Sequence, residues 1–395
     1  MRSVELFAGC GGLALGVARA GFEHALVVEI DEQAHATLEE NKRRNVKHIA
    51  EWTLARKDVR GVDYRELAGE IDLVAGGPPC QPFSIGGKHL GPDDERNMWP
   101  EAVRAVRELR PKAFLFENVR GLLRPGFSQY LNYLTLYLSW PEIAVGADES
   151  WESHLIRLQQ HQEARKEEPG AYKVVFRGIN TADYGAAQKR HRAMAIGIRT
   201  DVAQDWTFPA PTHSREALLW SQAITGDYWT RHALEGTEIT KKVDARAVEK
   251  LRSQLVVPAE APWRTVRDAI GNLPEPLIEG SPGITNHILH PGARTYPRHT
   301  GSGWDEPAKA LKAGDHGVPG GENILALGED EVRYFTLREM ARLQGFPDEF
   351  FVPGTWKAPI KQLGNAVPVE LGEVLGKKIC GIINEKMAHA VSAAA

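Results

Sequence analysis

A cysteine framed by glycine and proline is the strongest chemical feature of this sequence. Cys80 lies in the run Gly76-Gly77-Pro78-Pro79-Cys80-Gln81-Pro82, and the paired prolines restrict the backbone that leads into it. A sulfur held in a fixed orientation beside small residues is suited to attack a bound substrate. A buried structural cysteine would not need such a frame, so we predict that Cys80 is a nucleophile.

Charged side chains adjoin two later apolar runs. Glu117 directly follows the run 113–116, and Arg190 and Arg192 directly precede another. Alternate residues of an extended segment face one way, so the two arginines would share a face with Gln188. Their guanidinium groups could bind a phosphate, a base carbonyl oxygen or the Glu117 carboxylate. By themselves these residues could be a solvated strand end and a solvated basic edge, but beside a nucleophile they become catalytic candidates.

A glycine-rich turn near the N-terminus is suited to a nucleoside. The run Phe7-Ala8-Gly9-Cys10-Gly11-Gly12 follows a predicted strand and opens a predicted helix, where backbone N–H groups can approach a ligand closely. Glu29 ends the next predicted strand, and a carboxylate there can accept both hydroxyls of a ribose. The glycine spacing does not fit a dinucleotide pyrophosphate or a P-loop, so S-adenosylmethionine fits better, although an ordinary βα turn would look similar. Asp58, after another polar turn, could accept the adenine amino group.

The elements that must position these groups alternate between strand and helix. We predict strands at 4–7, 25–29, 71–75 and 113–116, helices at 13–20 and 100–109, and further strands near 173–177 and 193–198. This alternation indicates a parallel, doubly wound sheet. Ligands of such sheets bind at the carboxyl ends of the strands, which is where the glycine-rich turn, Cys80 and Glu117 all fall.

The remainder of the chain does not follow this alternation. From about residue 201 to 330, Pro, Gly, Trp and His are frequent and strands are difficult to assign. Residues 141–170 indicate an inserted helix without chemistry, and 364–368 should open a last helix that packs back on the first domain. We therefore predict a catalytic and cofactor-binding domain at 1–200, a smaller irregular domain at 201–330, and returning helices at 331–395.

Composition excludes several classes of protein. The net charge of −4 over 395 residues argues against a histone-like DNA binder but allows a local basic face. Cys10, Cys80 and Cys380 are too widely spaced for a disulfide framework or a zinc site, so we expect no metal and a reducing environment. Neither a membrane-length apolar run nor a secretion leader is recognisable, which predicts a cytoplasmic protein.

Taken in order, these motifs resemble those of the C5-cytosine DNA methyltransferase family, of the bacterial and phage restriction-modification type. The resemblance covers about residues 1–200 and 330–385, and the segment between falls where the family has its variable target-recognition domain. The matching runs are the glycine-rich turn, Gly77 to Gln81, Glu117 to Val119, Gln188 to Arg192, 338–347 and 364–368. The insertion at about 141–170 is a mild departure.

The resemblance implies a fold and a cofactor. The fold is α/β, a doubly wound and mostly parallel Rossmann-like sheet of the S-adenosylmethionine-dependent methyltransferase type, with a smaller irregular target-recognition domain. S-adenosylmethionine would be the methyl donor and S-adenosylhomocysteine the product. The residues implied to line its site are Phe7, Gly9, Cys10, Gly11, Gly12, Glu29, Ile30, Asp58, Val59, Pro79, Asn365 and Val367.

The resemblance also implies a DNA cytosine-5 methyltransferase mechanism. Cys80 would add to C6 of the cytosine, with Glu117 at N3, Arg192 at O2 and Arg190 in support. Thiolate addition is needed because C5 of free cytosine is a poor nucleophile. The base must first be flipped out of the duplex, since the target atom is inaccessible inside it.

The implied partner is double-stranded DNA carrying a specific short sequence. The candidate contacts are Gln81, Ser84, Arg120, Arg294, Arg298, His299 and Lys312. Those after residue 200 are chosen by composition, and each could equally be part of a solvated loop. We expect a monomer, with a cognate restriction or phage-defence system as a possible partner. Three alternatives stay open: a tRNA cytosine methyltransferase with the same catalytic set, a catalytically silent DNA-binding regulator and an NAD-dependent oxidoreductase.

Overall fold

The computed structural model describes residues 1–79, 97–165, 171–234, 245–254, 257–295, 300–314, 321–328 and 331–394. Five of the predicted site residues, Cys80, Gln81, Ser84, Arg298 and His299, lie outside the described residues. By its internal contacts the chain divides into two units. Unit 1 comprises Met1–Ile179, His191–Pro209 and Gly372–Ala395, and unit 2 comprises Asn180–Arg190 and Ala210–Leu371.

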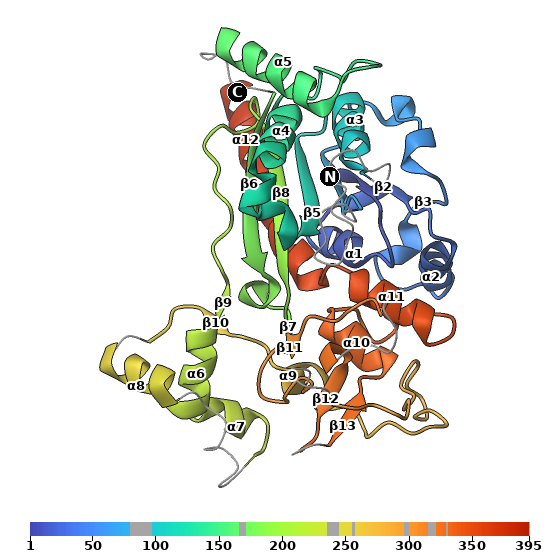
Figure 1. Ribbon diagram of the computed structural model, residues 1–395, viewed down its shortest axis with the longest axis vertical. Coiled ribbons are helices and arrows are strands. Elements are labelled where there is room, and N and C mark those ends of the chain that lie inside the picture. The colour runs from blue at the N-terminus through green and yellow to red at the C-terminus, as the bar shows by residue number, and fades with distance from the viewer. Residues whose placement is uncertain are drawn as a thin grey trace. The chain divides into compact units, whose positions relative to one another are not determined.

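Unit 1 is built on a seven-stranded sheet of order β3-β2-β1-β4-β5-β8-β6 (Figure 1). Its strands are β1 (Arg2–Leu6), β2 (Glu23–Val28), β3 (Leu54–Ala55), β4 (Leu73–Gly76), β5 (Ala113–Val119), β6 (Tyr172–Asn180) and β8 (His191–Arg199). The first five pair in parallel and β8 is antiparallel to β5. The mostly parallel α/β sheet is therefore confirmed. Strand order reverses between β1 and β4, the point where such sheets bind ligands.

Helices cover the sheet of unit 1. They are α1 (Gly12–Arg19), α2 (Glu32–Arg43), α3 (Trp99–Leu109), α4 (Ser128–Ser139), α5 (Trp151–Ala164) and α12 (Val369–Ala394). Buried side chains of α3 and α4 share one hydrophobic core with alternate residues of β1, including Val4 and Leu6. The last helix lies against the C-terminal end of α1, where a Cβ on Gly376 would be 2.7 Å from that of Ala20.

Unit 2 is made of short elements. Its strands form two-stranded pairs: β7 (Gln188–Lys189) with β11 (Ala308–Lys309), β9 (His213–Ser214) with β10 (Ala261–Pro262), and β12 (Ile324–Ala326) with β13 (Val332–Tyr334). Its helices are α6 (Arg215–Ala223), α7 (Asp227–Arg231), α8 (Ala245–Gln254), α9 (Val266–Ile270), α10 (Leu337–Leu343) and α11 (Lys357–Asn365). Such short strands explain why the sequence from 201 to 330 shows no clear alternation.

The two units differ from the domains predicted from the sequence. Residues 331–371 and 180–190 cluster with unit 2, and only the chain from Gly372 onward returns to unit 1. The reason is tertiary pairing: β13 pairs with β12, and Arg342 of α10 donates to the carbonyl of Ala269 in α9 at 3.2 Å. None of the helices within the described ranges is long and apolar enough to cross a membrane.

Candidate active site

A strained turn follows β1. Phe7 has φ of 55° and is in the left-handed region, which costs a non-glycine residue about 1 kcal/mol or more. Gly9 and Gly11 share this conformation, with φ of 56° and 88°. At Gly11 a side chain would also meet the Cδ2 of Leu38 at 2.9 Å. The turn thus uses glycine where the backbone requires it and leaves the N-terminus of α1 without a side-chain cap.

The carboxylate of Glu29 is held by backbone groups of this turn and of α2. It accepts the N–H of Gly9 at 2.6 Å and the N–H of Asp31 at 2.7 Å, and the residue is only 8% exposed. Burial raises the pKa of Glu29, while these two hydrogen bonds act in the opposite direction. The next residue, Ile30, is 60% exposed, so a buried acceptor and an accessible apolar side chain stand side by side.

Cys10 and Asp58, two further predicted cofactor residues, have pKa values that are shifted in opposite directions. Burial raises the pKa of Cys10 to about 12, so this thiol stays protonated near neutral pH and is no rival nucleophile. Asp58 caps the turn Val59–Gly61 by accepting the N–H of Arg60 at 3.0 Å. The Arg60 guanidinium lowers the pKa of Asp58. Val59 itself is buried.

Glu117 and Arg192 are brought together by the pairing of β5 with β8. The antiparallel register places Val119 opposite Arg192. The Nε of Arg192 lies 2.5 Å from Oε1 of Glu117, and their side chains are 16% and 13% exposed. The Nε–H is not aligned on that oxygen, so the contact is an ion pair, not a regular hydrogen bond. Two of the predicted catalytic side chains, Glu117 and Arg192, therefore form an ion pair.

The backbone that leads to Cys80 is tied to the same strand end. The Nδ2 of Asn118 donates to the carbonyl of Pro78 at 3.1 Å, and Asn118 is 3% exposed. A Cβ on Gly77 would lie 3.3 Å from Oε2 of Glu117, while Pro79 is exposed. Sequence reasoning missed Asn118, although its place between Glu117 and Val119 in a matched motif was a signal.

Arg190 is placed differently from the prediction. The sequence suggested that it shares a face with Arg192, but β7 ends at Lys189 and β8 begins at His191, so strand alternation does not extend across it. Arg190 is 2% exposed and belongs to unit 2. Its Nη1 donates to the carbonyl of Leu311 at 2.9 Å and its Nη2 to that of Gly364 at 2.7 Å. This guanidinium thus joins two backbone segments of unit 2.

Asn365 ends α11 and Val367 lies in the short turn that follows, which the sequence did not predict. Gly364 and Asn365 end α11 and do not open the last helix, which begins at Val369. Asn365 is exposed and Val367 is buried. The buried amide of Gln344 donates to the carbonyl of Leu363, and its backbone carbonyl accepts the N–H of Val369 at 2.9 Å. Gln344 belongs to the run 338–347, which therefore supports this turn.

Three candidate DNA contacts lie within the described residues. Arg120, Arg294 and Lys312 are all exposed. The Nζ of Lys312 lies 2.9 Å from Oε1 of Glu322, and Asn323 makes two 2.9 Å hydrogen bonds to the Lys312 backbone. Lys312 is thus held in place, and Glu322 partly balances its charge. Arg120 directly follows β5.

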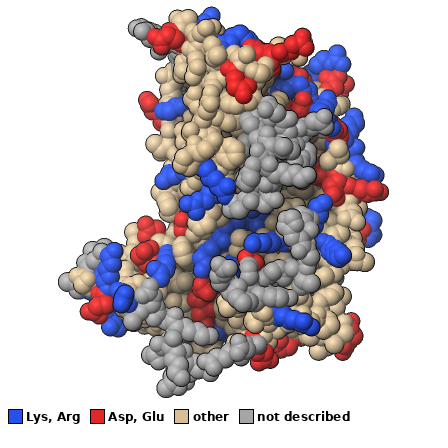
Figure 2. Space-filling model, in the orientation of Figure 1, with Lys and Arg blue, Asp and Glu red and all other residues tan. Residues whose placement is uncertain are grey.

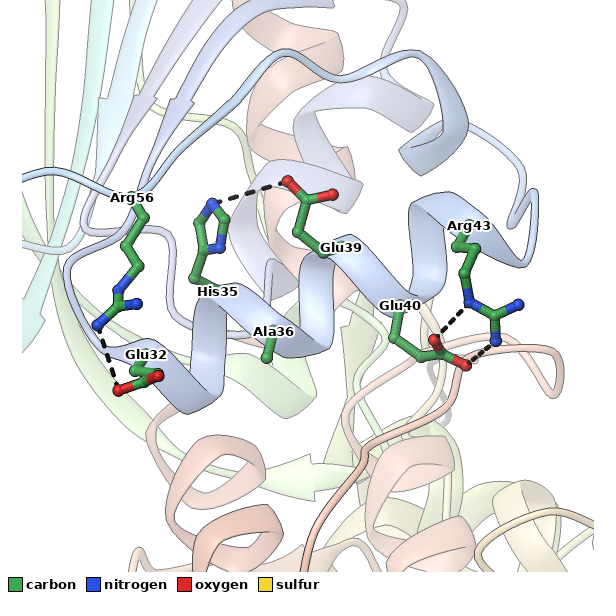
Figure 3. A pocket seen from close by; sticks show the side chains of 7 residues that line it. All are labelled: Glu32, His35, Ala36, Glu39, Glu40, Arg43 and Arg56. Atoms are coloured by element: carbon green, nitrogen blue, oxygen red, sulfur yellow. Dashed lines mark hydrogen bonds and ion pairs between the residues drawn. The ribbon is translucent and has the colours of Figure 1, made fainter.

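A shallow pocket of about 500 Å³ lies along α2 (Figure 3). Its charged side chains neutralise one another in ion pairs, such as Arg56 with Glu32 at 3.2 Å and Arg43 with Glu40 at 2.7 Å. It contains none of the predicted site residues, so we do not regard it as the active site. Within the described part of the chain, no group of three or more His, Cys, Asp or Glu could hold a metal ion.

Comparison with known proteins gives consistent matches over nearly the whole chain. A model of the C-5 cytosine-specific DNA methylase family matches residues 1–139 and 161–381. The chain is 32% identical over 383 residues to the Type II methyltransferase M.PspPI of Psychrobacter sp., covering 96% of this chain and 79% of that protein. It is 31% identical over 384 residues to the Type II methyltransferase M.Eco47II of Escherichia coli, covering 97% and 79%.

Solved structures support the fold at lower identity. The structure of the S. pombe Dnmt2 methyltransferase matches with a TM-score of 0.53 and 14% identity, covering 97% of this chain and 99% of that one. The Entamoeba histolytica methyltransferase EhMeth matches with a TM-score of 0.53 and 14% identity, covering 96% and 98%. The gap in the family match, residues 140–160, overlaps the insertion predicted from the sequence at about 141–170.

Proposed function

The chain belongs to the C-5 cytosine-specific DNA methylase family, and from this premise we propose how its residues carry out the methyl transfer. It is an S-adenosylmethionine-dependent DNA (cytosine-5) methyltransferase of the restriction-modification type. The roles of individual residues are our proposal. The observation that carries it is the ion pair of Arg192 with Glu117, at a strand end that also anchors the carbonyl of Pro78 through Asn118.

The edge of unit 1 next to β1 and β2 suits the cofactor. S-adenosylmethionine supplies an electrophilic methyl group when bound. The buried Glu29 carboxylate keeps further lone pairs for ribose hydroxyls, since each oxygen receives one backbone N–H. Ile30 offers accessible apolar surface to the adenine ring. We propose that the cofactor is held by Phe7, Gly9, Cys10, Gly11, Gly12, Glu29, Ile30, Asp58, Val59, Pro79, Asn365 and Val367.

Addition of Cys80 to the flipped cytosine would activate the base. The Cys80 thiolate forms a bond to C6, and N3 takes a proton from Glu117, which disperses the charge that develops in the ring. Arg192 donates to O2 of the base and holds the Glu117 carboxyl in orientation through their ion pair. C5 would then accept the methyl group, with the sulfonium–methyl bond as the bond that breaks and S-adenosylhomocysteine as the product that leaves.

Elimination would restore the enzyme. The C5 proton leaves to a base that we do not assign to any side chain, the Sγ–C6 bond breaks, and N3 returns its proton to Glu117. The Sγ–C6 and N3–H bonds formed in the addition are thereby broken again, and the C5–methyl bond remains. Arg190, whose two terminal nitrogens are engaged with the carbonyls of Leu311 and Gly364, would act as a positioning residue in unit 2.

DNA binding would rest on local positive charge. Figure 2 shows Lys and Arg side chains gathered in groups on one face, although the chain carries a net charge of −4. Cations of this kind contact phosphates and the edges of guanine. We propose Gln81, Ser84, Arg120, Arg294, Arg298, His299 and Lys312 as the contacts. We further propose that the enzyme acts as a monomer beside a cognate restriction endonuclease or defence system.

The proposal is tested by expressing the gene in a host that lacks cytosine methylation and reading genomic DNA by bisulfite sequencing. We expect protected cytosines within one short motif, and loss of that protection in Cys80→Ser, which should still bind S-adenosylmethionine because the proposed role of the sulfur is addition to C6 and not cofactor binding. A Cys80→Ser protein that methylates at the normal rate would exclude the mechanism. Methylation of tRNA and not of DNA would favour the tRNA enzyme.

A further inference from the structure

The insertion of this chain forms a helix with a defined docking surface. The family match omits residues 140–160, and α5 occupies Trp151–Ala164. Beneath it, α4 carries Tyr130, Tyr133 and Tyr137, which are spaced three and four residues apart and so line one face of the helix. All three tyrosines are 3% exposed. The inserted helix and this aromatic face therefore belong together.

The contacts between α5 and α4 are specific. The ring of Trp151 packs edge-on against Tyr130 at 5.4 Å between centroids and lies 5.7 Å from Tyr133. His154 is fully buried, with Nε2 2.9 Å from the carbonyl of Ile143 and Nδ1 3.1 Å from the hydroxyl of Tyr133. Since the Nε2–H must donate to that carbonyl, Nδ1 accepts the Tyr133 hydroxyl. Such paired polar contacts fix one docked position of the helix.

The same aromatic face reaches the start of α3. The hydroxyl of Tyr130 accepts a hydrogen bond from Nδ2 of Asn97 at 2.7 Å. The Oδ1 of Asn97 in turn accepts the N–H of Trp99 at 3.3 Å. Asn97 is the first described residue on the C-terminal side of Cys80. Tyr130 thus anchors the chain at the point where α3 begins.

Trp99 extends this path to the catalytic strand end. It is fully buried, and its ring packs edge-on against Phe116 of β5 at 5.9 Å between centroids. Phe116 directly precedes Glu117. A continuous set of contacts therefore runs from Trp151 of the insertion through Tyr130, Asn97 and Trp99 to the strand that carries Glu117.

We propose that the 140–160 insertion is a positioning element for catalysis: by packing on Tyr130 it fixes Asn97 and the start of α3, and through them the strand end at Glu117. This inference rests on the proposed function of Glu117. If α5 only stabilised the fold by covering apolar surface, the contacts of Leu155 and Leu158 would be enough, since these residues are 3% and 0% exposed. Such a stabilising role does not require the hydrogen bond from Asn97 to Tyr130.

The test uses the full-length protein and two variants that leave the packing of the insertion in place. Tyr130→Phe retains the ring against Trp151 and removes only the hydroxyl that Asn97 binds, and Asn97→Ala removes the donor. We expect each to lower the single-turnover rate of DNA methylation about three- to tenfold, the worth of one hydrogen bond, with S-adenosylhomocysteine affinity unchanged. The double variant should be no slower than Asn97→Ala alone, because Asn97→Ala already removes the bond to Tyr130 together with the bond that Oδ1 accepts from the N–H of Trp99.

The matched control is Tyr137→Phe, which removes a hydroxyl of the same aromatic face that bonds to Arg107 and to the backbone of Val145 and not to Asn97. It should leave the methylation rate unchanged, and amide hydrogen exchange at residues 99–103 should increase only in Tyr130→Phe and Asn97→Ala. Unchanged rates in those two variants, effects that multiply in the double variant, or an equal loss in Tyr137→Phe would each overturn the inference. A wild-type protein without DNA methylation would instead refute the proposed function, and the exchange data would still show whether Tyr130 anchors α3.

Discussion

At the residue scale, the strand end at Glu117 depends on neighbours that have no chemistry of their own. Asn118 holds the carbonyl of Pro78, so the backbone leading to Cys80 is tied to the strand that bears Glu117. Gly77 leaves room for the Glu117 carboxylate, because a Cβ at that position would lie 3.3 Å from Oε2. The orientation of Glu117, the proposed proton donor, thus depends on the absence of a side chain at Gly77 as well as on Arg192.

Gly77→Ala should therefore displace the Glu117 carboxylate by a few tenths of an ångström. We expect the rate of methyl transfer to fall about tenfold, the effect of misplacing a catalytic group, with cofactor affinity and thermal stability nearly unchanged. Single-turnover kinetics and cofactor titration measure the two quantities. Gly126→Ala is the control, since nothing lies within 4 Å of a Cβ there. Equal rates for both variants would show that Glu117 adapts freely.

At the element scale, α3 supports the proposed adenine site from behind. Arg104 of α3 donates to the carbonyl of Val59 at 2.6 Å and to that of Val62 at 3.2 Å, at the first residue of the turn that Asp58 caps and at the residue just after it. Glu101, one turn earlier, holds the guanidinium by accepting Nε at 2.7 Å. A helix outside the recognised motifs therefore fixes the position of Asp58 and Val59.

Arg104→Ala should loosen this turn and weaken cofactor binding. We expect the dissociation constant for S-adenosylhomocysteine to rise about three- to tenfold, as for loss of a charged hydrogen bond, with a higher KM for S-adenosylmethionine and little change in kcat. Calorimetric titration and steady-state kinetics give these values. Arg104→Lys should not restore affinity, because an ammonium lacks the planar fork that spans two carbonyls.

The control for Arg104 is Arg65→Ala. Arg65 lies near the same turn, but its side chain is 88% exposed and is paired with Asp63, so its loss should leave cofactor affinity unchanged. If Arg65→Ala weakened binding as much as Arg104→Ala, local positive charge and not the support of the turn would explain the result.

At the scale of the whole molecule, folding buries titratable groups that hold elements of unit 1 together. His24 of β2 lies 3.0 Å from the hydroxyl of Ser3 in β1 and 2.8 Å from the carbonyl of Ala14 in α1. Burial lowers the pKa of His24 from 6.5 to about 4. Burial also raises the pKa of Glu5, whose Oε2 has no hydrogen-bond partner.

The pKa of His24 predicts a loss of stability in mild acid. The unfolded chain takes up a proton near pH 6.5 and the folded protein only near pH 4, so the stabilisation is complete above pH 6.5 and declines as the pH falls. Between pH 7.5 and 5 this amounts to about 2 kcal/mol. Urea unfolding at the two pH values measures the change.

His24→Gln is the comparison that isolates this effect. The variant should be less stable at pH 7.5 but should lose about 2 kcal/mol less than wild type on going to pH 5. The comparison is needed because the raised pKa of Glu5 acts in the opposite direction, adding stability as the pH falls. Parallel pH dependences for wild type and His24→Gln would contradict the assignment.

Much of unit 1 could be predicted from the sequence, because its signals are local. The strands before Phe7 and Gly77, and the part of β5 before Glu117, are short apolar runs followed by glycine, proline or charge, and these residues determine local backbone structure without help from distant ones. The order of the motifs likewise identified the family, and the helix of the 141–170 insertion followed from its own apolar spacing.

Contacts between distant residues decided what the sequence left open. Arg190 bonds carbonyls that lie 121 and 174 residues further along the chain, so no local pattern could distinguish it from Arg192. The same holds for Asn118 with Pro78, for the return of 331–371 to unit 2, and for the aromatic face that joins the insertion to Asn97. Backbone conformation is set by neighbouring residues, whereas the use of a buried polar side chain depends on which partner the fold brings to it.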